Sequence, residues 1–590
     1  MSVLIPRPEH PNPQWERKNW KNLNGKWQFE IDATASGEQR GLIEAESLKD
    51  TITLPFCPEA PLSGVNHKDF MLAVWYKRTL NFKKEDLEGN RVILHFGAAD
   101  FETRLFVNAK KVGFAHIGCF GSFEYDITDY LKVGDNLITV ECLDDTRADY
   151  QAGGKQSLKY YSYGCFYTRT TGIWQTVWYE IVPESYIKYA KILPDAENLS
   201  VTVDAELVGT GDLTAEVYYE GRKVGEAKKK NLSVTGQIEI KLSEKHLWEV
   251  GCGRLYDLVL RFGKDEVKSY FGLRSIKIDG LKFLINGKSV FQRLVLDQGF
   301  YPDGIWTAPT EEALINDIKC SLMAGFNGAR LHEKVFEPRF LYHADRLGYM
   351  VWGEYGNWGF DHTDVGNIHT YLPDWISAVR RDINHPSIIG WCPFNETWDY
   401  GDQLKRQDDR VLRIIYEQTK LYDPSRPCID TSGNFHVVTD IFDVHDYDQN
   451  LERFEARYDE LTEKNEWTEF VPQCKNRQKW DKKLPIFISE YGGIGISPDA
   501  SLEKNSDTAS DRKNAWSYGK AAETYEEFYA RYRKLTHVML DNPKIMGFCY
   551  TQLTDIEQEV NGLFTYEGRV PKFDMNIISE INKKKAAIED

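Results

Sequence analysis

The sequence predicts a multidomain β plus α/β protein, in which two β-sandwiches precede a (β/α)8 TIM barrel. Three observations support this prediction. The chain has 590 residues, which is too many for one hydrophobic core. Its first half carries short strand patterns without a long helix, whereas its second half alternates short apolar strands with amphipathic helices. Alternation of this second kind is typical of a barrel with parallel strands.

The first β-sandwich is expected over residues 1–185. Residues 91–108, 136–145 and 172–182 have the β-branched and aromatic content of strands, and Asn and Gly residues punctuate the turns between them. Because no long helical pattern interrupts this region, its turns and strands are typical of one sandwich.

The strand pattern starts afresh in residues 186–275, where a second sandwich is expected. Residues 199–208 and 213–221 alternate apolar and polar side chains, and residues 255–263 continue the pattern. A region of about 90 residues with short strands suits an immunoglobulin-like β-sandwich.

The TIM barrel is expected over residues 276–590. Its eight strand candidates are residues 291–297, 328–331, 349–354, 388–396, 427–432, 441–447, 485–490 and 544–553. Helical patterns occur near residues 310–325, 338–347, 375–383 and 409–421. Thr310 is a predicted N-cap of the first helix, and Gly348 is predicted to end the second. In such barrels the active site lies at the C-terminal ends of the strands.

The composition narrows the range of partners. The formal net charge is −17 and the pI is about 5.4, whereas nucleic-acid-binding proteins usually carry a basic patch. No apolar stretch is long enough to span a membrane, and the N-terminal residues show no signal peptide. The 10 cysteines are scattered without metal-binding spacing. These features predict a cytoplasmic protein without a nucleic-acid or membrane partner, a cofactor or a metal, and they allow a homo-oligomer.

Two of the expected strands end on a glutamate after an apolar run. Glu396 ends the fourth candidate, IIGWCPFNE, and Glu490 ends the seventh, PIFISE. The fourth and seventh strands lie across the barrel mouth from each other, so the two carboxylates can approach. Cleavage of a glycosidic bond needs such a pair, because one carboxyl group protonates the leaving oxygen while the other attacks the anomeric carbon. The alternative is that both glutamates are rim charges in salt bridges.

Longer stretches of the chain resemble glycoside hydrolase family 2, and the resemblance covers nearly the whole chain. The stretches LNGKWQFEID, FVNAKKVGF and TTGIWQTVWYE resemble the jelly-roll sugar-binding domain of that family, and FLINGKSVFQR resembles its entry into the barrel. Residues 325–354 and 383–391 are also similar. The resemblance implies that the first sandwich is a jelly roll and that the protein is an O-glycosidase acting on an oligosaccharide or another glycoside.

The resemblance also implies roles for individual residues. Glu396 would be the general acid/base and Glu490 the nucleophile of a retaining double displacement. Asn395 would donate to the sugar hydroxyl beside the anomeric carbon. Tyr447 would hydrogen-bond Glu490, and Arg330 would favour the ionised form of that nucleophile.

Departures from the family pattern bear on the sugar. The glucuronidase members carry an Asn-x-Lys motif that binds the sugar carboxylate, whereas this chain has Glu559-Val560-Asn561 in its place. A neutral terminal sugar is therefore expected, first of all a β-galactoside. Tyr550 replaces a tryptophan common in the family, and Asp297-Gln298 replace an Arg-His run, so these three residues are expected to contact substrate. A β-galactofuranosidase or α-L-arabinofuranosidase is an alternative, and a non-catalytic carbohydrate-binding protein is another.

Other residues at strand ends are expected to bind substrate or to support the carboxylates. They are His332, Glu354, Trp398, His445 and Gln552. His332 follows Arg330 by two positions, so both side chains should point to the same side of their strand. For His332 and Trp398 the alternative is a role in core packing. The run from His445 to Asp448 does not predict a metal site, because successive strand residues point to opposite sides.

Overall fold

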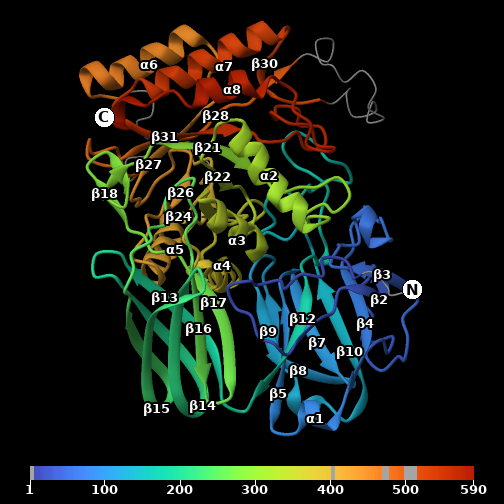
Figure 1. Ribbon diagram of the computed structural model, residues 1–590. Coiled ribbons are helices and arrows are strands. Elements are labelled where there is room, and N and C mark those ends of the chain that lie inside the picture. The colour runs from blue at the N-terminus through green and yellow to red at the C-terminus, as the bar shows by residue number, and fades with distance from the viewer. Residues whose placement is uncertain (1–4, 400–404, 468–476, 497–514, 590) are drawn as a thin grey trace.

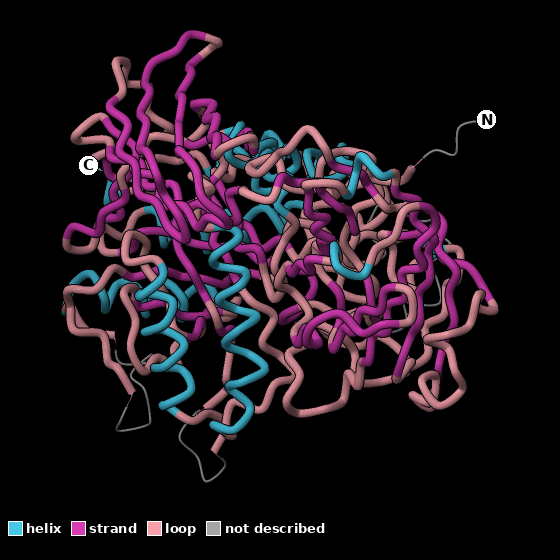
Figure 2. The backbone as a smooth tube through the Cα atoms, turned by 90° about the horizontal axis from the view of Figure 1, so that it is seen from below, coloured by secondary structure: helices cyan, strands magenta, loops and turns pink. Residues whose placement is uncertain are grey.

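The structure is a computed structural model that describes residues 5–399, 405–467, 477–496 and 515–589. It confirms the predicted fold class. The two β-sandwiches lie side by side, and the barrel with its helices lies above both of them (Figure 1). Seen from below, the strands of the two sandwiches lie on opposite sides of the view (Figure 2).

The first domain is a sandwich of two antiparallel sheets. One sheet has the strand order β1 (Trp20–Asn22), β12 (Val177–Pro183), β5 (Asn90–Phe96) and β9 (Phe123–Asp126). The other sheet has the order β3 (Asp50–Leu54), β2 (Gly25–Asp32), β4 (Ala73–Phe82), β10 (Gly134–Leu143), β7 (Glu102–Val107) and β8 (Lys110–Ile117). The short strands β6 (Ala99–Asp100) and β11 (Gly172–Ile173) pair, and helix α1 covers Lys84–Leu87. Alternating residues of β2, including Trp27 and Phe29, join the buried core, as a strand with one buried face requires.

The second domain is the immunoglobulin-like sandwich. Its strands are β13 (Tyr186–Asp195), β14 (Ser200–Tyr219), β15 (Arg222–Lys241), β16 (Tyr256–Phe262) and β17 (Asp265–Phe271). The two strands predicted at 199–208 and 213–221 form the single strand β14, because the residues between them are absorbed as irregularities in its pairing with β15. Gly209 adopts a φ of +79° there, which glycine tolerates without steric cost. A small sheet of β18 (Ile276–Asp279), β19 (Lys282–Ile285) and β20 (Lys288–Ser289) leads into the barrel.

Parallel strands form the barrel of the third domain, and each of the eight predicted strands overlaps at least one of them. They are β21 (Gln292–Asp297), β22 (Gly328–Leu331), β23 (Met350–Glu354), β24 (Ile388–Cys392) with its continuation β25 (Phe394–Asn395), β26 (Thr431–Ser432), β27 (Phe442–Asp446), β28 (Ile486–Gly492) and β31 (Ile545–Thr551). β24, β23, β22, β21, β31, β28 and β27 pair in this order in one sheet, and β25 pairs with β26 beside it. The strands β29 (Ile494–Ile496) and β30 (Tyr518–Ala522) form a separate pair at the mouth.

Helices cover the outside of the barrel. They are α2 (Glu311–Met323), α3 (Pro338–Leu347), α4 (Ile368–Asp382), α5 (Asp409–Tyr422), α6 (Leu451–Lys464), α7 (Tyr525–Leu540) and α8 (Met575–Asn582). Thr310 caps α2 by accepting from the Ala313 amide, and Gly348 ends α3 in the left-handed conformation, as predicted. Helix α4 begins before its predicted start at 375, because burial of Thr370 and Tyr371 holds the turn preceding Pro373. Within the described chain, no helix is long and apolar enough to cross a membrane.

Candidate active site

Glu490 lies on β28 with a donor on each carboxylate oxygen. Arg330 Nη1 donates to Oε1 at 3.0 Å, and the Tyr447 hydroxyl donates to Oε2 at 2.5 Å. The Glu490 side chain is 4% exposed, so these donors replace the water that a carboxylate would otherwise bind. Two donors on opposite oxygens fix the orientation of this carboxylate and stabilise its negative charge.

The guanidinium group of Arg330 donates hydrogen bonds to four residues at the barrel mouth. Besides Glu490, it donates to Glu354 at 2.5 Å, to the Ser489 carbonyl at 2.8 Å and to Asn395 Oδ1 at 3.1 Å. Burial lowers the pKa of Arg330, but the charges of Glu354 and Glu490 raise it by more, so the net shift of this pKa is well upward. Arg330 is therefore a permanent cation between two buried carboxylates.

Glu396 has different surroundings. Its backbone has a φ of +42°, an unusual value for a non-glycine residue, and its amide donates to the Ser432 carbonyl at 2.9 Å. Its Oε1 lies 2.6 Å from His445 Nδ1, and 19% of its side chain is exposed. One carboxylate oxygen of Glu396, one of Glu490 and a ring nitrogen of His445 all lie within 4.8 Å of one another. The structure thus brings the two predicted carboxylates together.

His445 shares a proton with Glu396. Its Nε2 lies 2.8 Å from the Ser432 hydroxyl, which donates its own hydrogen to Asp443 at 2.5 Å. When that hydrogen lies toward Asp443, the hydroxyl accepts from His445 Nε2, and the hydrogen between Nδ1 and Glu396 is the one that the two groups share. Burial lowers the pKa of His445, but the charges of Glu490 and Glu396 raise it above its ordinary value. Burial raises the pKa of Glu396, and the charge of His445 and its hydrogen bond turn the net shift downward.

Asn395 leaves a donor free beside these carboxylates. Its backbone amide donates to Asn357 Oδ1 at 2.6 Å, and its carbonyl accepts from Asn357 Nδ2 at 3.0 Å and from Trp358 Nε1 at 3.2 Å. Its Oδ1 is taken by Arg330. The buried Nδ2 has no hydrogen-bond partner in the described chain, so it is available to a ligand.

A loop of the first domain reaches the barrel mouth and delivers Lys155. The Gly153 and Gly154 amides donate to the carbonyls of Trp358 and Gly356, at 2.8 and 3.1 Å. Gly154 has a φ of +59°, and a Cβ there would lie 2.4 Å from the Glu333 carbonyl, so only glycine permits this approach. Lys155 is 4% exposed, and its Nζ lies 3.8 Å from the centroid of the Trp358 ring.

Glu559 faces the same region from the segment after β31. Its Oε2 accepts from the Tyr167 hydroxyl of the first domain, and its Oε1 accepts from Asn561 at 2.9 Å. Gln298 donates to the Tyr167 hydroxyl at 3.0 Å and to Gln552, and Gln552 donates to Asn561 at 3.0 Å. Burial raises the pKa of Glu559, against the opposing charge of Lys155. Gln298 and Gln552, both predicted site residues, thus belong to one network with Glu559.

Two predicted contacts are wrong, because strand alternation turns the side chains outward. Tyr550 packs against Tyr491 and against Tyr532 of α7, with ring centroids 5.5 and 4.9 Å away, and so faces the outer helices. Asp297 interacts electrostatically with Asp317 of α2 rather than with the carboxylate pair. Burial, and then the charge of Asp317, raise the pKa of Asp297 to about 7.

The remaining predicted residues lie around the pair. Glu354 binds Arg330 and lies 3.2 Å from His332 Nδ1. Burial and the charge of Lys155 lower the pKa of His332 well below its ordinary value, so this histidine is neutral. The Trp398 ring lies 4.7 Å from that of Trp358 and is partly exposed beside the carboxylates.

The sequence did not predict Lys155 as a site residue. It also did not predict the hydrogen bonds of Asn357 and Trp358 to Asn395, or that of Ser432 to His445. No local pattern marks Lys155, because the loop that carries it belongs to another domain. Among the described residues, Glu396, His445 and Glu490 are also spaced closely enough to hold a metal ion, but His445 Nδ1 is already bonded to Glu396. The absence of a metal and of a cofactor stays a prediction.

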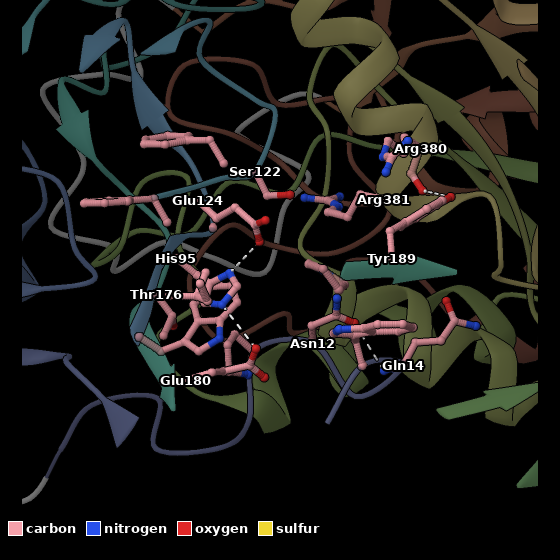
Figure 3. A pocket seen from close by; sticks show the side chains of 18 of the residues that line it. Asn12, Gln14, His95, Ser122, Glu124, Thr176, Glu180, Tyr189, Arg380 and Arg381 are labelled. Atoms are coloured by element: carbon pink, nitrogen blue, oxygen red, sulfur yellow. Dashed lines mark hydrogen bonds and ion pairs between the residues drawn. The ribbon is translucent and has the colours of Figure 1, made fainter. Parts of the chain in front are cut away.

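A second cleft, of about 390 Å³, lies where the three domains meet, away from the barrel mouth (Figure 3). His95 lies there between Glu124 and Glu180, with nitrogen–oxygen distances of 3.3 and 3.2 Å, and Arg380 and Arg381 line the other side. Glu180 also binds Arg17 at 2.7 Å. Each of these two carboxylates therefore lies beside a basic group in this cleft.

Family comparisons agree with the architecture of this site. A model of the glycosyl hydrolase family 2 TIM barrel domain matches residues 276–580. The chain belongs to glycosyl hydrolase family 2. The sugar binding domain of family 2 matches residues 20–156, and a further family 2 model matches residues 185–274.

Individual relatives are distant. The chain is 25% identical over 463 residues to a β-galactosidase of Thermoanaerobacter pseudethanolicus, covering 73% of this chain and 57% of that protein. It is 24% identical over 446 residues to a β-glucuronidase of Paenibacillus borealis, covering 69% and 72%. The chain spans about half the length of several of the curated family 2 relatives that it matches. The β-glucuronidase of Ruminococcus gnavus has the same fold, with a TM-score of 0.77 at 18% identity over 98% of this chain and 99% of that one.

Proposed function

We propose that the protein is a retaining exo-glycosidase that removes a β-linked terminal sugar. The observation that carries the proposal is the pair of Glu396 and Glu490, whose carboxylate oxygens approach within 4.8 Å in unlike surroundings. Retaining glycosidases hold their two carboxyl groups about 5–5.5 Å apart, whereas inverting enzymes need about 6.5–9.5 Å to admit a water molecule. The separation in this site supports retention.

In the first step, the Glu490 carboxylate attacks the anomeric carbon and the bond to the leaving oxygen breaks. Glu396 gives its proton to that oxygen, and His445 is placed to supply the proton through the bond that the two share. Arg330 and Tyr447 hold Glu490 in line during the attack. The products of this step are the free aglycone and a glycosyl ester of Glu490.

In the second step, the ionised Glu396 takes a proton from water, and the oxygen of that water attacks the anomeric carbon. The ester bond breaks, Glu490 recovers its charge, and the sugar leaves with its original anomeric configuration. The free Nδ2 of Asn395 can donate to the hydroxyl beside the reacting carbon in both steps. A hydrogen bond that strengthens in the transition state accelerates the reaction.

A β-galactoside is the first candidate substrate, because β-galactosidases are among the relatives and the Asn-x-Lys motif of glucuronidases is absent. A β-glucuronide is the second candidate. It is favoured by the free ammonium group of Lys155 in the pocket and by the β-glucuronidases among the relatives. The furanosidase alternative receives no support from these relatives. A non-catalytic sugar-binding role would leave the approach of two carboxylates unexplained.

The test uses two substitutions and a panel of 4-nitrophenyl glycosides. Glu490→Gln removes the nucleophile, so turnover of every glycoside in the panel is expected to fall by a factor of about 10⁴ or more. Glu396→Gln is expected to slow poor leaving groups by about 10²–10⁴, and activated leaving groups less, because only the former need a proton. Normal turnover by Glu490→Gln, or product of inverted configuration, contradicts the proposal.

A further inference from the structure

The ammonium group of Lys155 has no protein partner. Among the residues that the structure describes, none forms a hydrogen bond or an ion pair with Nζ, which instead lies over the Trp358 ring. Loss of hydration by a lysine that is 4% exposed is costly unless its charge is compensated. The charges of Glu559, Glu490 and Glu396 act on Lys155, so its compensation comes from the catalytic pocket itself.

Glu559 is the natural counterpart of this ammonium. Its two oxygens each accept one hydrogen bond, from Tyr167 and Asn561, and each keeps a further lone pair. Both bonds are donated to the carboxylate and favour its ionised form, against the burial that raises its pKa. Lys155 comes from the first domain and Glu559 from the barrel, yet Tyr167 links them: its amide donates to the Lys155 carbonyl at 2.8 Å, and its hydroxyl donates to Glu559 Oε2.

We infer that Lys155 and Glu559 form a donor–acceptor pair that binds hydroxyl groups of a neutral terminal sugar. This inference rests on the glycosidase function proposed above and specifies its substrate class. A sugar hydroxyl both donates and accepts, so it needs a donor and an acceptor from the protein, whereas a substrate carboxylate needs donors only.

The free polar atoms of the pocket meet the requirement of a hydroxyl-rich ligand. Asn395 Nδ2 is a free donor and Gln298 Oε1 a free acceptor, and both are buried without a partner in the described chain. Lys155 lies over the Trp358 ring, which donates to the Asn395 carbonyl, and Gln298 donates to Tyr167, which binds Glu559. The four side chains together supply two donors and two acceptors. A carboxylate placed among them would face Glu559 as well as Lys155, and the two contributions would oppose each other.

The charges of the site support the same conclusion. When the proton shared with His445 lies on Glu396 for catalysis, His445 is neutral, and the cation of Arg330 is matched by Glu354 and Glu490 at 2.5 and 3.0 Å. Lys155 is then matched by Glu559. No positive charge remains in excess for a uronic acid, so the lysine does not restore the uronide recognition that the absent Asn-x-Lys motif would provide.

The experiment compares kcat/KM for 4-nitrophenyl β-galactoside, β-glucoside and β-glucuronide. Lys155→Met is expected to lower kcat/KM for the better neutral substrate about 10- to 150-fold, the range for a hydrogen bond to a charged group. Glu559→Gln is expected to raise the ratio of uronide to neutral cleavage at least about tenfold, because Lys155 loses its opposing charge. In the double variant the losses should be less than additive, since the two residues hold one ligand.

Two controls separate binding from folding and from the proposed function. Lys77→Met removes another buried lysine of the first domain, one that donates to the Ile43 and Ala45 carbonyls, and is expected to leave the ratio of the three substrates unchanged. Glu490→Gln tests the catalytic assignment independently of the sugar.

Specific outcomes overturn the inference. If the wild type cleaves the β-glucuronide best and Lys155→Met abolishes that preference, the lysine binds a substrate carboxylate. If Lys155→Met and Glu559→Gln slow all three substrates equally, the two residues stabilise structure rather than select the sugar. If Glu490→Gln keeps wild-type turnover, the proposed function fails, whatever the ratios.

Discussion

Replacing Tyr447 with phenylalanine removes its hydrogen bond to the proposed nucleophile. The hydroxyl lies 2.5 Å from Glu490 Oε2 and 2.9 Å from Thr551 Oγ1, while the ring stacks on Tyr518 with centroids 3.6 Å apart, so phenylalanine keeps the ring packing and loses the contacts of the hydroxyl. A hydrogen bond to a charged group contributes about 1.5–3 kcal/mol. At about 1.4 kcal/mol for each factor of ten in rate, kcat/KM is expected to fall about 10- to 150-fold. Initial rates with the best 4-nitrophenyl glycoside measure this loss.

The matched control is Tyr518→Phe, which removes a hydroxyl from the other ring of the same stack. Its kcat/KM is expected to stay within about twofold of the wild type, because the ring contact with Tyr447 remains. The thermal unfolding midpoint should be unchanged in both variants. If Tyr447→Phe retains wild-type kcat/KM, or if Tyr518→Phe loses as much, the hydroxyl does not hold Glu490 for attack.

Two further predictions concern the charges around the pair. His445→Gln removes one of the two groups that share a proton. Because the pair binds that proton at least as tightly as Glu396 alone, the basic limb of the pH–rate profile is expected to move to lower pH. A move to higher pH would contradict a shared proton. Arg330→Met leaves Glu354 and Glu490 buried without their cation and is expected to cost about 3–5 kcal/mol in urea unfolding. Arg410→Met removes a guanidinium that is 73% exposed beside Asp408 and should cost far less, and equal losses would contradict the organising role of Arg330.

The sequence predicted those parts of the barrel that local patterns encode. Every predicted barrel strand overlaps an observed one, because a buried parallel strand needs a continuous apolar run whatever surrounds it. Glu396 and Glu490 were found as interruptions of such runs. Alternation along β22 correctly placed Arg330 and His332 on the inner face.

The errors arose where the same alternation was not applied. Asp297 ends β21 and Tyr550 lies near the end of β31, and both seemed well placed by sequence position alone. Their neighbours Gln298 and Thr551 face the mouth instead, since Gln298 joins the Tyr167 network and Thr551 lies 2.9 Å from the Tyr447 hydroxyl. A shift of one residue along a strand reverses the side to which a side chain points.

Lys155 could not be predicted, because its position depends on how two domains dock. The contacts that bring it to the barrel mouth are backbone hydrogen bonds from Gly153 and Gly154. Two successive glycines indicate a turn in the sequence, but they do not show which domain the turn will meet. The sequence has Glu559-Val560-Asn561 at the position expected for the Asn-x-Lys motif of glucuronidases. The lack of a lysine at that position did not imply that no lysine lies near the carboxylates.

Surroundings rather than residue type separate the proposed roles of the two glutamates. Glu490 is enclosed, and each of its oxygens faces a donor that cannot take up a proton at neutral pH, namely the guanidinium of Arg330 and the hydroxyl of Tyr447. Glu396 is more exposed, and its main partner is His445, a base that can give up its proton near neutral pH. A carboxylate with fixed donors is suited to attack, and one with a titrating partner is suited to give and take a proton twice in each cycle. Exchanging the two partners, rather than the two glutamates, would therefore exchange the roles.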